Sequence, residues 1–190
     1  EGLWMSLLLY PDCPIELWPR LMTASACAVA EAIEHESSLQ CGIKWPNDLI
    51  IHGKKVGGLL MEMGQHPTHG SFAVLGIGIN VNQKSFPLEL STKATSLALE
   101  LSTSLDLTSL AAKILDQLHP YFEKAANNFP EILTIATSRS TVLGSFLKLK
   151  AGNDLLEGVA EALDSEGRLL LRLTSGKLIA FSSGEVTTQQ

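Results

Sequence analysis

Apolar runs separated by turn residues divide the first part of the chain into one helix and several strands. Residues 3–10 are almost entirely apolar and end at Pro11-Asp12, which is typical of a buried strand. Apolar side chains then recur at helical spacing from residue 18 to residue 33, with Pro19 in the first turn, where a missing N–H breaks no hydrogen bond. Turns and a loop at 64–70 separate four further predicted strands, which span residues 43–45, 49–51, 55–63 and 72–81.

The second part of the chain changes from helical to strand-like spacing. Asp106 or Thr108 can cap a helix, and Pro120 is expected to kink or divide it. A second, short helix is predicted to begin at Pro130. After residue 144, short apolar runs alternate with turns, and the predicted strands are 146–150, 155–163, 168–174 and 177–181.

These elements predict an α+β fold with two domains. Residues 1–142 are expected to form a mixed sheet with helices, and residues 143–190 a small SH3-like β-barrel. The composition agrees with a globular chain, since 45% of the 190 residues are hydrophobic and 18% are charged. The net charge of −6 gives no general attraction for nucleic acid or anionic membranes, and no apolar run reaches the roughly 18 residues of a spanning helix. We therefore expect neither nucleic acid nor a membrane as a partner.

The cysteines and histidines predict neither a disulfide framework nor a metal site. Cys13, Cys27 and Cys41 are odd in number and lack C-x-x-C spacing, which is typical of reduced thiols in a cytoplasmic protein. His66 and His69 lie in a loop that contains glycine and proline, without carboxylates or cysteines arranged around them. No metal ligands are therefore predicted.

Two neighbouring segments combine lysines with turn residues and glycines. The segment Lys44-Trp45-Pro46-Asn47-Asp48 ends a strand, and its spacing alone also fits a plain strand–turn–strand. In residues 55–62, Lys55 opens an apolar strand that contains two adjacent glycines. Each glycine weakens a strand by roughly 0.5–1 kcal/mol relative to alanine, which usually marks a bulge or a backbone that closely approaches a ligand. A solvated pair of turn lysines, Lys54 and Lys55, is the simpler alternative.

A third segment, residues 75–82, places Gly76 and Gly78 in a strand that continues to Asn80. It is not a dinucleotide-binding fingerprint, because no third glycine and no helix follow. If the two glycine-containing strands pair, they leave a flat slot with bare backbone N–H and C=O groups facing a ligand. We expect the slot to be lined by Leu59, Leu60 and Ile77.

In this order, residues 44–48, 55–62 and 76–82 resemble the biotin–protein ligase family, whose pattern is K-W-P-N-D, then K-[hydrophobic]-[AG]-G-I-L-x-E, then G-[hydrophobic]-G-I-N. The resemblance covers the whole chain, and the small β domain at the end also suits this family. It implies a biotin ligase/lipoate ligase-like catalytic domain and a two-step reaction. Biotin and ATP, with Mg²⁺ accompanying the ATP phosphates, give biotinyl-5′-AMP and pyrophosphate. A lysine of a biotin carboxyl carrier protein, that of acetyl-CoA carboxylase, then takes the biotin as an amide.

The resemblance also implies roles for individual residues. Lys55 is expected to contact both the biotin carboxylate and the phosphate, and Lys55, Lys44 and Asp48 form the expected catalytic set. Asp48 would orient or deprotonate the incoming lysine. Besides Lys55, the expected biotin site consists of Gly58, Gly76, Gly78 and Leu60. The expected ATP site consists of Asn80, as the amide that reads adenine, with Lys44 and Asn47.

The chain departs from the family pattern at its beginning. The family has a basic loop, G-R-G-R-x-G-R, preceded by a T-N-x-x-A-like segment and followed by a tryptophan that stacks on the nucleotide. None of these occurs here. Because the chain opens at Glu1 directly into a strand, we expect upstream residues to have been lost or left out, and the chain as given to make biotinyl-AMP poorly. Some family members also act as repressors through a helix-turn-helix, but this chain contains no recognition helix with basic residues.

Two other functions compete with biotin ligation. A lipoate or octanoate ligase could share the catalytic fold, although Trp45-Pro46 argues against it. A module that binds biotin or a carrier protein without chemistry is favoured by the missing phosphate loop.

Exposed strand edges would also allow a homodimer.

Overall fold

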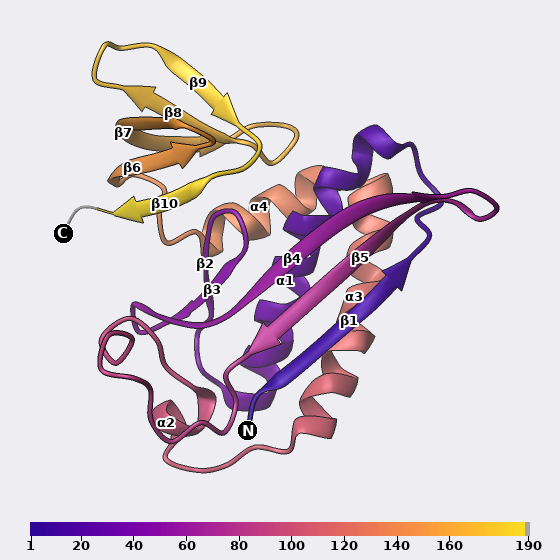
Figure 1. Cartoon of the computed structure of the whole chain (residues 1–190), viewed down its shortest axis with the longest axis vertical. Coiled ribbons are helices and arrows are strands. Elements are labelled where there is room, and N and C mark those ends of the chain that lie inside the picture. Colours follow the sequence, from indigo (N-terminus) through magenta and orange to yellow (C-terminus); the bar gives the residue numbers. More distant parts are fainter. Residues whose placement is uncertain (189–190) are drawn as a thin grey trace.

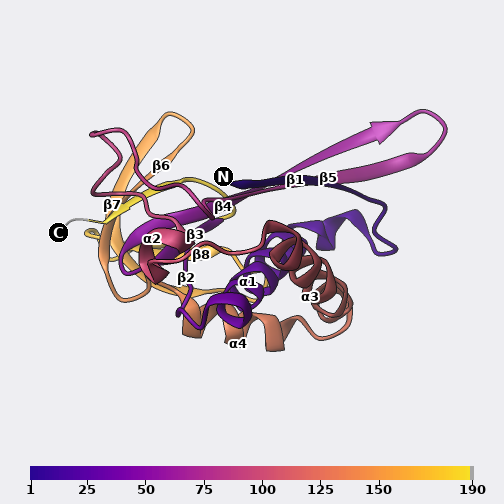
Figure 2. The same ribbon diagram turned by 90° about the horizontal axis from the view of Figure 1, so that it is seen from below.

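Two antiparallel sheets, one of them backed by helices, make up the structure (Figure 1). The computed structural model describes residues 1–188. The short 3-10 helix η1 (Ile15–Leu17) leads into α1 (Trp18–Ser37), and α1 packs with α3 (Leu107–Asn127) and α4 (Phe129–Arg139). These three long helices lie on the same side of the first sheet (Figure 2). The α+β class predicted from the sequence is therefore confirmed.

The first sheet has the strand order β1-β5-β4-β3-β2. Its strands are β1 (Leu3–Leu9), β2 (Gly42–Lys44), β3 (Asp48–Ile51), β4 (Lys54–His66) and β5 (Gly70–Ile79). Each neighbouring pair is antiparallel, where a mixed sheet was expected. The tight turns that join β2 through β5 explain the difference, because parallel neighbours need a long crossover connection.

Apolar side chains of the first sheet and the helices form the larger core. The sheet contributes fully buried leucines and isoleucines, among them Leu49, Ile51, Leu75 and Ile79. On α1, Ala24, Ala28 and Ala30 are also fully buried. Their small side chains let the helix lie close against the sheet, as its composition predicted. One face of the sheet is thereby fixed, and the opposite face remains for a site.

Three elements differ from their prediction. β1 is not a strand buried on both faces, because its alternate side chains point away from the helices and leave Trp4 72% exposed. The loop expected at 64–70 is shorter, since β4 continues to His66 and only residues 67–69 form the turn. Helix α3 is not divided at Pro120, one of the two predicted outcomes, because the partner residue Asp116 is exposed and water can bond to its unpaired carbonyl.

Besides η1, two short elements have no counterpart in the prediction. Helix α2 (Leu97–Leu101) is five residues long, and the Ser96 side chain caps it by accepting a hydrogen bond from Leu99 N at 3.2 Å. Strand β10 (Glu185–Thr188) pairs with β6. Both are too short to show a period in the sequence.

The second sheet has the order β10-β6-β7-β8-β9. Strands β6 (Phe146–Ala151), β7 (Asp154–Leu163), β8 (Leu169–Leu173) and β9 (Leu178–Phe181) confirm the four predicted ones. The sheet has a small core of its own, which includes Leu147, Leu149, Leu169, Leu171 and Val186. Within residues 1–188, the edge strands β9 and β10 do not pair with each other, so the SH3-like barrel is not closed. The domain boundary between residues 142 and 143 stays a prediction.

No helix within residues 1–188 combines the length and the apolar character needed to cross a membrane.

Candidate functional site

A row of facing residues runs across the first sheet on the side away from the helices. The register pairs each of these residues with the next, one on each strand: Trp4, Gly78, Gly58, Asp48 and Lys44. Directly opposite residues of an antiparallel sheet point to the same face. An aromatic ring therefore stands at one end of the row and two charged side chains at the other, with two glycines between them. With about 4.8 Å per strand, the row is about 19 Å long.

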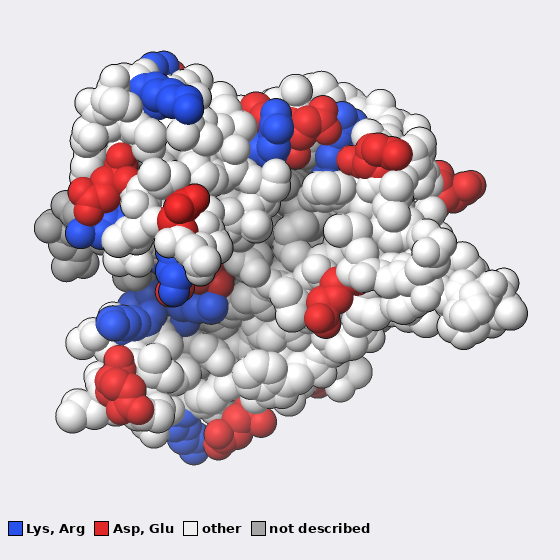
Figure 3. Space-filling model, turned by 45° about the horizontal axis from the view of Figure 1, so that its top comes forward, with Lys and Arg blue, Asp and Glu red and all other residues white. Residues whose placement is uncertain are grey.

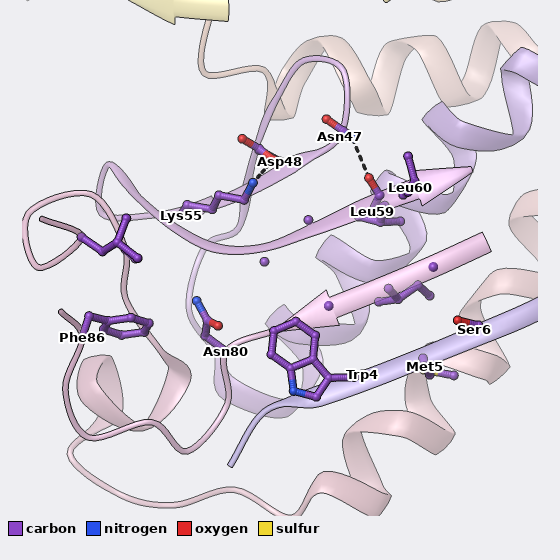
Figure 4. A pocket seen from close by; sticks show the side chains of 17 residues that line it. Trp4, Met5, Ser6, Asn47, Asp48, Lys55, Leu59, Leu60, Asn80 and Phe86 are labelled. Carbon is purple, nitrogen blue, oxygen red and sulfur yellow. Dashed lines mark hydrogen bonds and ion pairs between the residues drawn. The ribbon is translucent and has the colours of Figure 1, made fainter. Parts of the chain in front are cut away.

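The next row deepens the space above the glycines. Ser6 faces Gly76, and Gly76 faces Leu60. A Cβ atom added at Gly76 would meet no atom closer than 3.7 Å, whereas one added at Gly78 would come within 2.9 Å of the Trp4 ring. The missing side chains leave a groove of about 710 Å³, shown in Figure 4 and called the glycine groove below. Its volume is in the range of small-molecule sites.

The walls of the glycine groove differ in part from the predicted ones. Leu60 lines it, as predicted, and is 58% exposed. Leu59 and Ile77 face each other on the helix side of the sheet and are buried in the larger core, so only their backbone borders the groove. The period of two along a strand explains the correction, because Leu59 and Leu60 cannot both point to one face.

Lys55 reaches the groove because of an irregularity in the sheet. Leu49 pairs with Gly57 and Ile50 with Lys55, so Val56 is an extra residue in β4. Such a bulge redirects the neighbouring side chain. The Lys55 backbone is held by another segment: its N donates to Lys93 O at 2.8 Å, and its O accepts from Thr95 N at 2.9 Å.

The Lys55 ammonium and the Asp48 carboxylate form an ion pair over Gly58. Nζ and Oδ1 are 2.5 Å apart, and the two side chains are 50% and 25% exposed. A Cβ atom at Gly58 would lie 3.2 Å from Asp48 Oδ1 and 3.3 Å from Lys55 Nζ. The absence of a side chain at Gly58 therefore leaves room for the pair, which stands at the edge of the glycine groove (Figure 4).

The loop at residues 44–48 folds back onto β4. Asn47 Nδ2 donates to Leu59 O at 2.5 Å, and Asn47 O accepts from Leu59 N at 3.0 Å. Lys44 lies outside the glycine groove and lines a second cavity of about 380 Å³, together with Lys55, Asp48 and residues of β10. In the space-filling view, Lys and Arg side chains gather at a hollow beneath the C-terminal sheet (Figure 3). The structure thus brings all the predicted site residues together at the glycine groove except Lys44, which lines the neighbouring cavity instead.

Asn80 lies at the end of β5, where the groove meets the segment before α2. Its Nδ2 donates to Thr95 O at 3.1 Å, and its Oδ1 accepts from Gln83 Nε2 at 3.3 Å. An amide has two donor hydrogens and two acceptor lone pairs, so one of each is left for a ligand. The amide therefore lies beside the groove with hydrogen-bonding capacity to spare, and its role in reading adenine stays a prediction.

Several lining residues of the groove have no counterpart in the sequence prediction: Trp4, Met5, Ser6, Phe86, Leu90 and Ala94. Trp4 and Ser6 could not be placed without the β1–β5 register. Phe86 and Leu90 come from a mostly polar stretch whose large apolar residues are Phe86, Leu88 and Leu90, and their spacing does not show which of them line a groove. The groove is therefore more apolar than expected and has a cation at one edge, which suits a ligand with an apolar body and an anionic end.

Within residues 1–188, no three His, Cys, Asp or Glu side chains gather as in a metal site.

Glu100 of α2 ties the segment around Thr95 to the β3–β4 turn. Its carboxylate accepts from Thr95 Oγ1 at 2.5 Å and contacts His52 Nδ1 at 2.6 Å. These hydrogen bonds, from Thr95 first and then His52, hold the pKa of the Glu100 carboxyl below its usual value. Because Thr95 is bonded to the Lys55 backbone, Glu100 supports the position of Lys55 from outside the groove.

Glu100→Gln is expected to lower the free energy of unfolding at neutral pH and to speed amide exchange at Thr95 and Lys55. The folded-state pKa of Glu100 is lowered, so its stabilising contribution is complete above the ordinary value of 4.5 and is lost as the pH falls through the lowered pKa. Urea unfolding of both proteins at a series of pH values should show a difference that shrinks below about pH 4.5. The control is Glu123→Gln, whose partner His119 lies 3.7 Å away in an exposed pair; an equal effect of both variants would contradict the tie.

Comparison with family models gives two matches along the chain. A model described as the biotin/lipoate A/B protein ligase family matches residues 1–82, and one described as the biotin protein ligase C terminal domain matches residues 143–187. The first contains the glycine groove strands and the 44–48 loop, and the second contains the second sheet except its last residue.

Individual relatives agree with these matches. The bifunctional ligase/repressor BirA of Bacillus spizizenii is 37% identical over 93% of this chain and 55% of its own. The biotin--[acetyl-CoA-carboxylase] ligase of Mycobacterium tuberculosis is 33% identical over 92% of this chain and 64% of its own. The chain thus spans between half and two thirds of the length of these curated relatives.

Solved structures extend the likeness to the fold. The apo structure of the biotin protein ligase from Aquifex aeolicus superposes with a TM-score of 0.88, at 29% identity, over 100% of this chain and 82% of that one. The same enzyme in complex with biotin and ATP gives a TM-score of 0.83 over 100% and 78% of the two chains. Two family models in the order of the two sheets, curated relatives and solved structures all agree with the three sequence motifs. Residues 1–82 therefore form a domain of the biotin/lipoate A/B protein ligase family, and residues 143–187 a biotin protein ligase C-terminal domain.

Proposed function

We propose that this protein attaches biotin to a lysine of a carrier protein in an ATP-dependent reaction, through biotinyl-5′-AMP. The observation that carries the proposal is the Lys55–Asp48 ion pair at the edge of an apolar groove whose floor is made of glycines. The Aquifex aeolicus enzyme of the same fold has been solved with biotin and ATP, which supports this choice of substrates. The groove accommodates an apolar acyl chain, and the cation lies where its carboxylate would end.

In the first step, a biotin carboxylate oxygen attacks the α-phosphorus of ATP. A new O–P bond forms, and the bond to the pyrophosphate leaving group breaks. The catalytic contribution of the protein is position and charge stabilisation. We assign the stabilising cation to Lys55, which would contact both the carboxylate and the α-phosphate. Lys44, from the neighbouring cavity, would face the outgoing phosphates. Mg²⁺ would enter with the phosphates of ATP.

The glycine groove would hold the biotin. Backbone groups of Gly58, Gly76 and Gly78 would border its ring, and Leu60 would line the valeryl chain. Trp4, which stands over Gly78, adds an aromatic wall. On the nucleotide side, the free capacity of the Asn80 amide would bind adenine. One Nδ2 hydrogen of Asn47 is bonded to Leu59 O, so its other Nδ2 hydrogen and its Oδ1 would be left for ATP.

In the second step, a carrier lysine attacks the acyl carbon of biotinyl-AMP, an amide bond forms, and AMP leaves. A free lysine amine has a pKa of about 10.4 and must lose a proton first. We assign the proton acceptor to Asp48, whose carboxylate lies beside Lys55 at the mouth of the groove. The carrier would be that of acetyl-CoA carboxylase, which appears in the name of the Mycobacterium tuberculosis relative.

We further propose a cytoplasmic location and allow for a homodimer. All three cysteines are free thiols, and burial raises the pKa of Cys27 and of Cys41 to about 12, which makes them unreactive. The outer strand β1 of the first sheet offers an edge through which a second copy could pair.

The choice of acyl substrate is tested by competition. The full-length protein, with ATP and a biotin carrier domain, should add a biotin mass to one lysine of the carrier, and lipoic acid in excess should not replace it. The C-terminal match favours biotin, whereas the model for residues 1–82 covers both ligase types. Lipoylation of a carrier domain instead would favour the lipoate alternative. Binding of biotin without any mass added to the carrier would favour a non-catalytic module.

A further inference from the structure

We infer that the C-terminal sheet positions the loop that carries Lys44, Asn47 and Asp48, and that Trp45 is the link between them. The inference rests on the proposed function, because it concerns the same site. Trp45 lies in the middle of this loop, yet its side chain is 8% exposed and belongs to the core of the second sheet. Its indole Nε1 donates to Gly167 O at 3.2 Å, across 122 residues of sequence.

Gly167 lies in the β7–β8 turn, which has little freedom to move. Asp164 Oδ1 accepts from Glu166 N at 2.9 Å and from Arg168 N at 3.0 Å, and Gly167 N donates to Asp164 O at 3.0 Å. Gly167 itself has a φ of +79°, and a Cβ atom there would come within 2.9 Å of Thr23 Oγ1 on α1. Only glycine meets both conditions without strain. The acceptor for the Trp45 indole is therefore held in one place.

The helices of the larger core fix the same turn from the other side. Arg20 of α1 donates to both carboxylate oxygens of Glu166, at 3.1 Å and 2.9 Å. The Arg20 guanidinium also lies over the ring of Phe129, the first residue of α4, at 4.9 Å from its centroid. A two-pronged arginine–carboxylate contact fixes orientation as well as distance. The β7–β8 turn thus fixes the Trp45 indole relative to helices α1 and α4.

From Trp45, the contacts continue to the reacting groups. Asn47, two residues on, is bonded to β4 through its side chain and its carbonyl, and Asp48 pairs with Lys55. A displacement of Trp45 would move Asp48 relative to Lys55, and misplacement of reacting groups by about 1 Å can reduce a rate up to 10²-fold. Trp45 is a positioning residue in this view, because it acts through its neighbours in the loop.

The chain contains a matched control for Trp45. The Trp18 side chain is also buried, at 3% exposure, and its Nε1 donates to the backbone Cys13 O at 3.1 Å. Trp45→Phe and Trp18→Phe therefore remove the same kind of hydrogen bond, from indole N–H to a backbone carbonyl, from two buried rings, one in the loop and one at the start of α1. Both should lower the melting temperature by similar amounts. Trp45→Phe alone should lower kcat for adenylate formation about tenfold in the full-length protein, with KM for biotin changed less than twofold.

A second pair of variants tests the distant end of the contact chain. The side chains of Glu166 and Glu157 are both 42% exposed, and each pairs with a basic residue, but Glu157 contacts Lys148 within the second sheet. Glu166→Ala should speed amide exchange at Leu59, whose N donates to Asn47 O, and lower kcat several-fold. Glu157→Ala should change neither.

Two outcomes would overturn the inference: unchanged Leu59 exchange and kcat in folded Trp45→Phe and Glu166→Ala, or equal losses in the two tryptophan variants. An inactive wild-type protein would refute the proposed function, and the exchange measurement would still decide whether the C-terminal sheet positions the loop.

Discussion

Replacing Lys55 by alanine is expected to reduce biotinyl-AMP formation by about 10²–10³, the usual effect of removing one preorganised donor from a developing charge. The fold should survive. The Lys55–Asp48 pair is partly exposed, at 50% and 25%, and such pairs contribute only about 0–1 kcal/mol to stability. The Lys55 backbone bonds to Lys93 and Thr95 are available to alanine as well. Biotin-dependent exchange of pyrophosphate into ATP, measured on the full-length protein, gives the rate.

Lys54→Ala is the matched control for this prediction. It removes the same charge from the adjacent residue, so it tests whether the general positive potential near the groove is sufficient. We expect Lys54→Ala to stay within a few-fold of wild type. Exchange by Lys55→Ala at a similar level would show that its ammonium is not the stabilising cation.

Gly78→Val is expected to weaken biotin binding at least about 100-fold, a loss of about 2.7 kcal/mol, with little effect on folding. The first atom of the new side chain would come within 2.9 Å of the Trp4 ring. Because Trp4 is 72% exposed, its ring can swing aside without disturbing the core, and the valine would then occupy the groove. Titration calorimetry with biotin and a melting curve measure the two effects separately.

Two further variants show whether the lost space is the cause. Gly76→Ala adds a methyl group with no neighbour closer than 3.7 Å, so it should fold normally and weaken biotin binding less than Gly78→Val. Adding Trp4→Ala to Gly78→Val should not restore the affinity, because the valine still occupies the groove; recovery would show that the displaced Trp4 ring, not the lost space, weakens binding. Wild-type affinity in a folded Gly78→Val protein would mean that biotin does not bind in the glycine groove.

The sequence was sufficient to predict the strands of the site and most of its residues. Glycines at 57, 58, 76 and 78 in two apolar runs indicated a stretch of sheet without side chains. The register places Gly76 and Gly78 on the floor of the groove and Gly58 beneath the Lys55–Asp48 ion pair. Lys55 and Asp48 were predicted as functional residues because the three motifs resemble those of the biotin–protein ligase family, while their spacing alone also fitted solvated turn residues. Local composition was sufficient for the strands, since strand and turn residues follow short-range rules.

Other parts of the site depend on contacts between distant residues and could not be predicted. The β1–β5 pairing places Trp4 beside the groove. The Trp45 side chain packs in the core of the second sheet, where it bonds to Gly167, 122 residues further along the chain. The bulge at Val56, which brings Lys55 to Asp48, has no signature of its own in the sequence. Leu59 was placed on the wrong face because an apolar pair does not show which member points to the core.

The most direct test of the account is a single-turnover experiment with ATP labelled at the α-phosphate. The full-length protein, mixed with biotin and this ATP in the absence of a carrier, should accumulate labelled biotinyl-AMP in an amount close to that of the protein. Addition of a carrier domain should then convert the label to AMP as biotin is transferred. Failure to form labelled biotinyl-AMP, in a protein shown by calorimetry to bind both biotin and ATP, would contradict the assignment of adenylation to the Lys55–Asp48 site.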